Sequence, residues 1–128
     1  MAMTPYLYYR DVGRAQAFLA KAFGFRKYGR PMLRNGKVVH AAMKCGDDVI
    51  MLGHPGPKYR NPKQLKAVTQ GLYINVADVN RHYRRARKAG ATILEAPVDA
   101  HYGDRRYAAV DPEGHHWYFA HPIRKKAR

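Results

Sequence analysis

The sequence predicts an α+β fold of two similar halves, each with the element order strand, helix and three strands. Two repeated spacings carry this prediction. The dipeptide Asp11-Val12 recurs as Asp78-Val79, and the tripeptide His40-Ala41-Ala42 is followed by Tyr107-Ala108-Ala109, both after 67 residues (78 − 11 and 107 − 40). One fixed spacing for two motifs indicates an imperfect duplication of a single structural unit. At 128 residues the chain is large enough for one compact domain with its own core.

Residues 4–54 form the first predicted module. The aromatic-rich residues 6–9 predict a strand, and Asp11 is a suitable N-cap for a helix over residues 12–23. Gly24 is expected to end this helix, since glycine readily adopts the left-handed conformation found there. Three strands should follow. The first two are joined by Asn35-Gly36, a strong two-residue hairpin signal, and the last two by a turn at Gly46.

Residues 55–69 contain three prolines and several lysine and arginine residues, a composition typical of a linker. The second predicted module spans residues 70–122 and repeats the order of the first. It has a strand over residues 72–76, a helix that starts at Asp78 and closes at Gly90, and a strand over residues 91–94. A final hairpin surrounds the turn Asp111-Pro112-Glu113-Gly114. Residues 123–128 are interpreted as a basic tail.

The chain is strongly basic, with 24 Lys and Arg against 9 Asp and Glu and a formal charge of +15. Such a surface attracts anionic partners and binds nucleic acid non-specifically at low salt. The basic residues are spread over the first loop, the linker, the second helix and the tail, and no nucleic-acid-binding motif accompanies them. We therefore interpret the charge as a general surface property and expect nucleic-acid binding only of that non-specific kind.

Nothing in the sequence predicts membrane insertion or export. No apolar run approaches the roughly 20 residues of a membrane span, and residues 1–5 lack the charged and apolar regions of a signal peptide. We expect a cytoplasmic protein. Its one cysteine, Cys45, precedes Asp47 and Asp48, whose charges should raise the thiol pKa and keep the thiol unreactive.

The C-terminal motifs add a family resemblance to this pattern. They are Tyr-Gly-Asp-Arg-Arg-Tyr at residues 102–107 and Asp-Pro-Glu-Gly-His-His-Trp at residues 111–117. With the two βαβββ halves and the Asp-Val helix starts, they resemble the glyoxalase/bleomycin-resistance/dioxygenase (vicinal oxygen chelate) superfamily, and within it the PhnB-like proteins, over residues 4–122. The resemblance implies a curved mixed sheet with helices on its convex face, a ligand cavity on its concave face, and a homodimer.

The resemblance also implies where a metal would bind in the enzymes of the superfamily, which place His, Gln or Glu on the first and last strand of each module. The matching positions here are Thr4, Ile50, Gly71 and Tyr118. This set lacks the imidazole, carboxylate or thiolate ligands that a divalent metal needs. We therefore expect no metal and no cofactor, and the metal chemistry of the family does not transfer.

Strand alternation predicts which residues would line the cavity. Leu7, Leu72, Ile74, Val76, Trp117 and Phe119 suit the face packed on the helices. The opposite face receives a polar and aromatic set suited to a planar ligand; its members are Tyr6, Tyr8, Tyr73, Asn75, His116 and Tyr118. The matched third-strand residues His40 and Tyr107 are added to this set, with Arg106 at the mouth. Asp104 is expected to pair with Arg105 or Arg106 and leave the other arginine for an anionic ligand. His54, His82 and His121 have no visible partners and are predicted to lie on the surface.

Three functions compete on this evidence. The first is a metal-independent protein that binds a small aromatic or anionic molecule. The second is an enzyme, a lyase, isomerase or dioxygenase with a non-standard metal site. The missing metal ligands argue against this hypothesis, which stays as an alternative. The third is a basic nucleic-acid-associated protein, against which the spread of the charge argues. The first hypothesis fits the residues best and leaves the catalytic residues unassigned.

Overall fold

A computed structural model describes residues 1–123 of the chain. The first module contains β1 (Tyr6–Tyr8), α1 (Val12–Phe23), β2 (Arg26–Arg34), β3 (Lys37–Cys45) and β4 (Asp48–Gly53). The second contains β5 (Gly71–Asn75), α3 (Val79–Lys88), β6 (Thr92–Asp99), β7 (Asp104–Val110) and β8 (His116–Pro122). The predicted order of elements is confirmed in both modules. The predicted basic tail lies outside the described residues except for Ile123.

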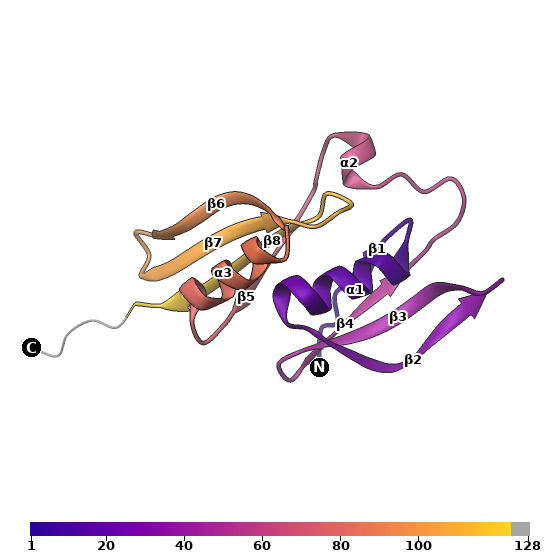
Figure 1. Ribbon diagram of the computed structural model, residues 1–128, viewed down its shortest axis with the longest axis horizontal. Coiled ribbons are helices and arrows are strands. Elements are labelled where there is room, and N and C mark those ends of the chain that lie inside the picture. The colour runs from indigo at the N-terminus through magenta and orange to yellow at the C-terminus, as the bar shows by residue number, and fades with distance from the viewer. Residues whose placement is uncertain (124–128) are drawn as a thin grey trace, which may run out of the picture.

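Each module folds its four strands into a sheet of its own (Figure 1). The strand orders are β1-β4-β3-β2 and β5-β8-β7-β6, so the two sheets have the same topology. In each sheet the first strand pairs in parallel with the last, and the remaining pairs are antiparallel. The predicted α+β fold of two βαβββ modules is confirmed. Within the chain, β1 and β5 are edge strands of separate sheets.

The local signals in the sequence explain where the elements begin and end. Asp11 and Asp78 cap α1 and α3, and their side chains accept hydrogen bonds from the backbone N–H groups of Arg14 and Arg81 at 3.0 and 3.1 Å. Gly24 ends α1 in the left-handed region, at a φ of 77°. Asn35-Gly36 turns β2 into β3 with positive φ at both residues, as a two-residue hairpin turn of this kind requires.

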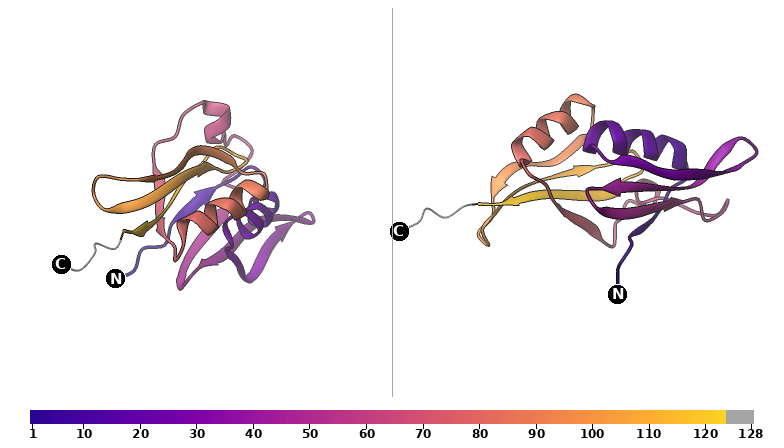
Figure 2. Two further views of the ribbon diagram at one scale, coloured as in Figure 1. Left: turned by 60° about the vertical axis from the view of Figure 1, so that its left-hand side comes forward. Right: turned by 90° about the horizontal axis from the view of Figure 1, so that it is seen from below.

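The two helices cover one side of both sheets and leave the other side open (Figure 2). The core lies between these layers. Its largest fully buried side chains include Trp117, Phe119, Tyr9 and Leu19. The predicted helix-facing residues of β1 and β8 are buried, and those of β5 are half-buried against the same core. Among residues 1–123, no helix is long and apolar enough to cross a membrane.

The turn between β7 and β8 ties the modules and the linker together. The carboxylate of Glu113 accepts hydrogen bonds from the backbone N–H groups of Arg10 and Asp11, at 2.7 and 2.9 Å, and from the side-chain amide of Asn61 at 2.9 Å. Asn61 in turn caps the short helix α2 (Pro62–Leu65), which the sequence analysis did not predict within the linker. Charge-assisted bonds of this kind are stronger than neutral ones, so Glu113 fixes how the chain passes between the modules.

Two side chains of α3 form hydrogen bonds with carbonyls at the C-terminal end of α1. Arg85 donates from Nε to the carbonyl of Lys21 and from a terminal nitrogen to that of Ala20, at 3.0 and 3.1 Å. His82 lies 2.8 Å from the carbonyl of Phe23 through Nε2 and 2.5 Å from the hydroxyl of Tyr107 through Nδ1.

The prediction that His82 lies on the surface without a partner was therefore wrong. The other two histidines of that prediction also have partners: His54 lies 3.1 Å through Nδ1 from the carbonyl of Tyr9, and His121 accepts from the backbone N–H of Val79. The partners of His82 lie on other elements and could not be identified from local spacing.

Candidate ligand-binding site

The open side of each sheet carries a group of the predicted cavity residues. We define the module-one cluster as Tyr6 and Tyr8 on β1 with His40 on β3. The module-two cluster consists of residues on β5, β7 and β8; its members are Tyr73, Asn75, Arg106, His116 and Tyr118. Within residues 1–123, ring contacts join members of each cluster, but none joins one cluster to the other.

The module-one cluster is a set of edge-to-face aromatic contacts. The Tyr6 ring lies 5.4 Å from that of Tyr8 and 5.6 Å from that of His40. Tyr59 from the linker meets Tyr8 at 6.0 Å, and its hydroxyl donates to the carbonyl of Tyr8 at 2.9 Å. Burial and the charge of Glu113 raise the pKa of Tyr59 to about 12, so it stays a donor at neutral pH. Tyr6 and Tyr8 are 45% and 47% exposed, which leaves ring area free for a ligand.

The module-two cluster combines stacked phenols with a cation. The rings of Tyr73 and Tyr118 lie 6.4 Å apart and nearly parallel, at 19°. The guanidinium of Arg106 sits 5.9 Å from the centre of the Tyr118 ring and pairs with Glu95 at 3.3 Å, while its buried Nε has no partner among residues 1–123. The Arg106 side chain is 29% exposed, so the guanidinium beside the ring suits a planar ligand that carries an acceptor or an acidic group.

In each cluster, the edge of one tyrosine ring packs closely against a strand glycine. A Cβ added to Gly71 on β5 would lie only 2.7 Å from Cε2 of Tyr118, and one added to Gly53 on β4 would collide with the ring of Tyr6. Neither glycine has positive φ, so what requires glycine here is the closeness of the ring. The edge of each ring therefore packs against a strand position where no side chain stands in its way.

Tyr107 does not belong to the cavity, contrary to the prediction. It is fully buried against the helices, and its hydroxyl faces His82. The reason is a difference in hairpin length. Ala42 pairs with Met51, and Ala108 pairs with Tyr118, so the second hairpin is one residue longer. A shift of one residue moves a side chain to the other face of a strand. The counterpart of His40 is therefore Arg106, and both lie on the open side.

The same one-residue shift corrects the metal positions. Ile50 is buried on the helix-facing side, and the residue that pairs with Tyr6 on the open side is Met51. Tyr118 pairs with Tyr73 in the other sheet. Phenols and a thioether do not hold a divalent metal, and residues 1–123 contain no group of three or more His, Cys, Asp or Glu side chains placed to do so. The side chains present do not fit the metal that the superfamily's enzymes use.

The predicted cavity residues line several separate hollows. Tyr6 and Tyr8 line a hollow of about 270 Å³ beneath the linker, together with Tyr59 and His115. Tyr73 and Asn75 border a larger cleft of about 620 Å³ between the modules. His116 lies beside a third hollow of about 560 Å³, next to α2. A single chain thus presents the clusters on open surfaces and does not enclose them in one cavity.

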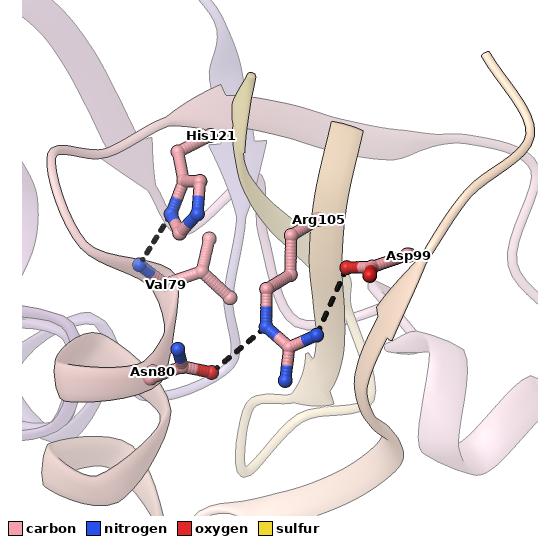
Figure 3. A network of polar contacts seen from close by, with 5 residues as sticks. All are labelled: Val79, Asn80, Asp99, Arg105 and His121. Atoms are coloured by element: carbon pink, nitrogen blue, oxygen red, sulfur yellow. Dashed lines mark hydrogen bonds and ion pairs between the residues drawn. The ribbon is translucent and has the colours of Figure 1, made fainter. Parts of the chain in front are cut away.

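The expected pairing at the mouth is also different. Asp104 pairs with neither arginine and instead accepts a hydrogen bond of 2.6 Å from the hydroxyl of Tyr73. Arg105 is held by Asp99 at 2.9 Å and by Asn80 at 3.0 Å, while His121 accepts from the backbone N–H of Val79 at 2.9 Å (Figure 3). Asp99 and Asn80 hold Arg105, and strand alternation from Ala108, which pairs with Tyr118, places Arg106 on the open side.

The sequence analysis missed two residues that contact members of the clusters. Glu95, which pairs with Arg106, lies on a part of β6 that extends beyond the predicted strand. Alternation from Ile93 would have placed it on the helix-facing side, but a register irregularity between Ile93 and Glu95 brings it opposite Ala108, on the open side. Tyr59 lies in the linker, where no local signal indicates that its ring contacts Tyr8. Cys45 agrees with the prediction: burial and the charge of Asp48 raise its pKa to about 11.

Comparison with known sequences gives a family match. The chain matches the family described as "Glyoxalase/Bleomycin resistance protein/Dioxygenase superfamily" over residues 3–119. It is 33% identical over 129 residues to "Uncharacterized protein Rv0887c" of Mycobacterium tuberculosis, an alignment that covers 97% of this chain and 76% of that protein. "Uncharacterized protein Mb0911c" of Mycobacterium bovis is also 33% identical, with 97% of this chain and 85% of that protein covered.

Solved structures share the fold. TioX from Micromonospora sp. ML1 superimposes with a TM-score of 0.77 at 30% identity, covering 96% of this chain and 99% of TioX. Lactoylglutathione lyase from Agrobacterium tumefaciens gives a TM-score of 0.67 at 22% identity, with 94% of this chain and 92% of that chain covered. At that lower identity the likeness to the lyase extends to the fold alone.

Proposed function

We propose that this chain, which belongs to the glyoxalase/bleomycin resistance protein/dioxygenase superfamily, binds a small planar aromatic molecule without a metal. The observation that carries the proposal is the pair of tyrosine clusters on the open sides of the two sheets. In each, a tyrosine ring packs by its edge against a strand glycine on the open side of the sheet. Arg106 places a guanidinium beside Tyr118 with its side chain 29% exposed, so an anionic group on the ligand fits there.

The exposure of these rings supports a binding role. Tyr6, Tyr8 and Tyr73 are each close to half exposed, although strands normally bury aromatic residues against a neighbour. Exposed apolar area that gathers on one face commonly marks a binding surface. Phenol hydroxyls can also orient a planar ligand by hydrogen bonds at its rim.

The side chains on the open faces support the proposed metal independence. Tyr6 with Met51 and Tyr73 with Tyr118 occupy the paired strand positions, and neither pair supplies a ligand that a divalent metal prefers. A lyase, isomerase or dioxygenase of the metal-dependent kind would need such ligands. We therefore favour a binding protein over an enzyme.

We further propose a homodimer in which the open side of one subunit faces that of the other, so that the module-one cluster of one chain meets the module-two cluster of its partner. The unpaired edges of β1 and β5 and the exposed rings on both sheets support this arrangement. We assign the chain to the PhnB-like branch on the motifs at residues 102–107 and 111–117. The lone cysteine suits a reducing compartment, and we place the protein in the cytoplasm.

Titration with a panel of planar aromatic compounds, with and without a carboxylate, followed by amide resonances, tests the binding proposal. Resonance changes should concentrate on β1, β5 and β8. Amide shifts are preferable to tryptophan fluorescence because Trp117 is fully buried on the helix-facing side. Tyr73→Ala and Tyr118→Ala should each weaken binding by about 1–3 kcal/mol, the scale of a lost aromatic contact with its hydrogen bond.

Tyr83→Ala is the matched control, since Tyr83 is a half-buried tyrosine on α3, on the other side of the sheet. It should leave the affinity unchanged. Binding that is insensitive to Tyr73→Ala and Tyr118→Ala in folded protein would contradict the proposed site. Elemental analysis that finds about one divalent metal per chain after mild purification would contradict metal independence.

A further inference from the structure

The outer face of α3 is the most concentrated positive surface among the described residues. Four of its ten residues are arginines and a fifth is a lysine, and the helix contains no acidic residue. Arg81, Arg84 and Lys88 recur at spacings of three and four residues and therefore lie on one side of the helix. They point away from Val79 and Ala86, which are buried against the core.

These cations are free of intramolecular partners. Two ion pairs occur among residues 1–123, Arg105 with Asp99 and Arg106 with Glu95, and neither involves α3. Arg85 is occupied by carbonyls at the end of α1. That contact places Lys21 of α1 beside the same surface. The remaining α3 side chains, Arg81, Arg84, Arg87 and Lys88, are exposed and enter no side-chain hydrogen bond within the described part of the chain.

We propose that this face, made of Lys21, Arg81, Arg84, Arg87 and Lys88, binds the phosphates of duplex nucleic acid without reading the base sequence. A rigid helix that presents several cations on one side neutralises several phosphates at once. Helix α3 covers one side of the sheets (Figure 2), and the tyrosine clusters lie on the open side, so both surfaces can be occupied together.

The surroundings of this face favour a duplex over other polyanions. Among residues 1–123, none of the exposed large hydrophobic side chains lies on α1 or α3. A membrane-bound helix needs such side chains to enter the interface. Recognition of single strands relies on aromatic rings that stack on bases, and the exposed tyrosines of this protein lie on strands and loops. What remains on the helix face is a set of charges that match a phosphate backbone.

The basic strand β2 is a weaker candidate. Arg26 and Lys27 are neighbours in a strand, so their side chains point to opposite faces and their charges are divided between two surfaces. On α3 the helical spacing gathers the charges on one side. This difference supplies a matched control, because three charge reversals on either element change the net charge by the same amount.

Fluorescence anisotropy with a duplex of about 20 base pairs, between about 50 and 200 mM salt, tests the proposal. The triple variant R81E/R84E/R87E should bind at least about tenfold more weakly at the low-salt end. The slope of log K against log salt should become shallower by about 2 to 3, since each lost phosphate contact removes about 0.9. The control R26E/K27E/R30E should keep most of the slope. Circular dichroism shows that both variants are folded.

Equal losses in the two triple variants would overturn the proposal, because binding would then follow net charge alone. Tighter binding of a single strand of the same length, or binding to vesicles that contain phosphatidylserine without binding to the duplex, would also overturn it. The affinity for an aromatic probe at the tyrosine clusters should stay the same in both variants. That readout separates failure of this inference from failure of the proposed ligand site.

Discussion

The hydroxyl of Tyr9 donates a hydrogen bond of 2.6 Å to the carboxylate of Asp111, which lies 102 residues further along the chain. Tyr9 follows β1, and Asp111 opens the turn between β7 and β8, so this bond joins the two modules. The same carboxylate accepts from the indole N–H of Trp117 and the backbone N–H of Glu113, both at 3.0 Å. Burial, with the charge of Asp111, raises the pKa of the Tyr9 phenol well above its usual value and keeps it a donor.

Tyr9→Phe should lower the free energy of unfolding by about 1–3 kcal/mol, because it leaves a buried carboxylate one donor short. Asp111→Ala should lower it further, since it leaves both the Tyr9 hydroxyl and the Trp117 indole unpaired. Urea denaturation measures both changes. Tyr8→Phe is the matched control: its ring is 47% exposed, and its removal of a hydroxyl should change stability by less than about 0.5 kcal/mol. A Tyr9→Phe protein as stable as that control would contradict the role of this bond.

The secondary structure could be predicted because its signals are local. Asp11 and Gly24 bound α1 in the sequence as they do in the structure, and Asn35-Gly36 makes the expected turn. The alternation of Trp117 and Phe119 with their neighbours identified the core face of β8. What joins the modules was not predictable in this way, because partners so distant in the chain leave no periodic signal.

His82 should make the stability of the protein depend on pH. Burial lowers the pKa of its imidazole; the bond to the Phe23 carbonyl acts in the opposite direction, and the charge of Arg85 lowers the pKa further. The carbonyl can only accept, so Nε2 carries the proton and Nδ1 accepts from the Tyr107 hydroxyl. Below the unfolded-state pKa of about 6.5, the unfolded chain takes up a proton that the folded chain resists. The free energy of unfolding should therefore fall as the pH drops below that value.

Urea denaturation between about pH 5 and 7 measures this dependence. His82→Phe keeps an aromatic ring against Phe23 and Phe119 and should flatten the curve over that range. His101→Gln is the control, because His101 is exposed and its side chain enters no hydrogen bond among residues 1–123, and it should leave the curve as in the parent protein. The same slope in all three proteins would show that another group is responsible.

Gly71→Ala should weaken binding of a planar aromatic ligand by about 1–2 kcal/mol, the scale of a displaced aromatic contact. The added Cβ would lie 2.7 Å from the Tyr118 ring, which must move away from the sheet. Ligand titration followed by amide resonances measures the loss. Gly13→Ala is a matched control, since its added Cβ meets nothing closer than 3.7 Å, and α1 lies on the other side of the sheet. An undiminished affinity in folded Gly71→Ala protein would contradict a role of the Tyr118 ring, packed against Gly71, in binding.

The sequence predicts only part of the candidate site, because the register in which the strands pair cannot be read from a single strand. Alternation placed Tyr6, Tyr73 and Tyr118 on the open face, because the alternation of side chains between the two faces can be recognised within a single strand. It misplaced Tyr107 because matching it with His40 assumed hairpins of equal length, and one extra residue reverses the face. The single cavity expected from the family resemblance stays a prediction, as it would require the two clusters to come from different subunits.

The open faces predict that the protein is a dimer in solution, with twice the mass of one chain in light scattering. Met32 and Val98 pair with His40 and Arg106 and are 60% and 41% exposed, so a second copy seated on these faces would cover them. Met32→Glu combined with Val98→Glu should shift the equilibrium toward the monomer, because a carboxylate buried in an interface without a partner is strongly unfavourable. Ala17→Glu, on the exposed side of α1, should leave the dimer intact. A monomer across a wide concentration range would contradict the shared cavity, whereas a dimer that survives the double substitution would mean that the subunits do not meet through these faces.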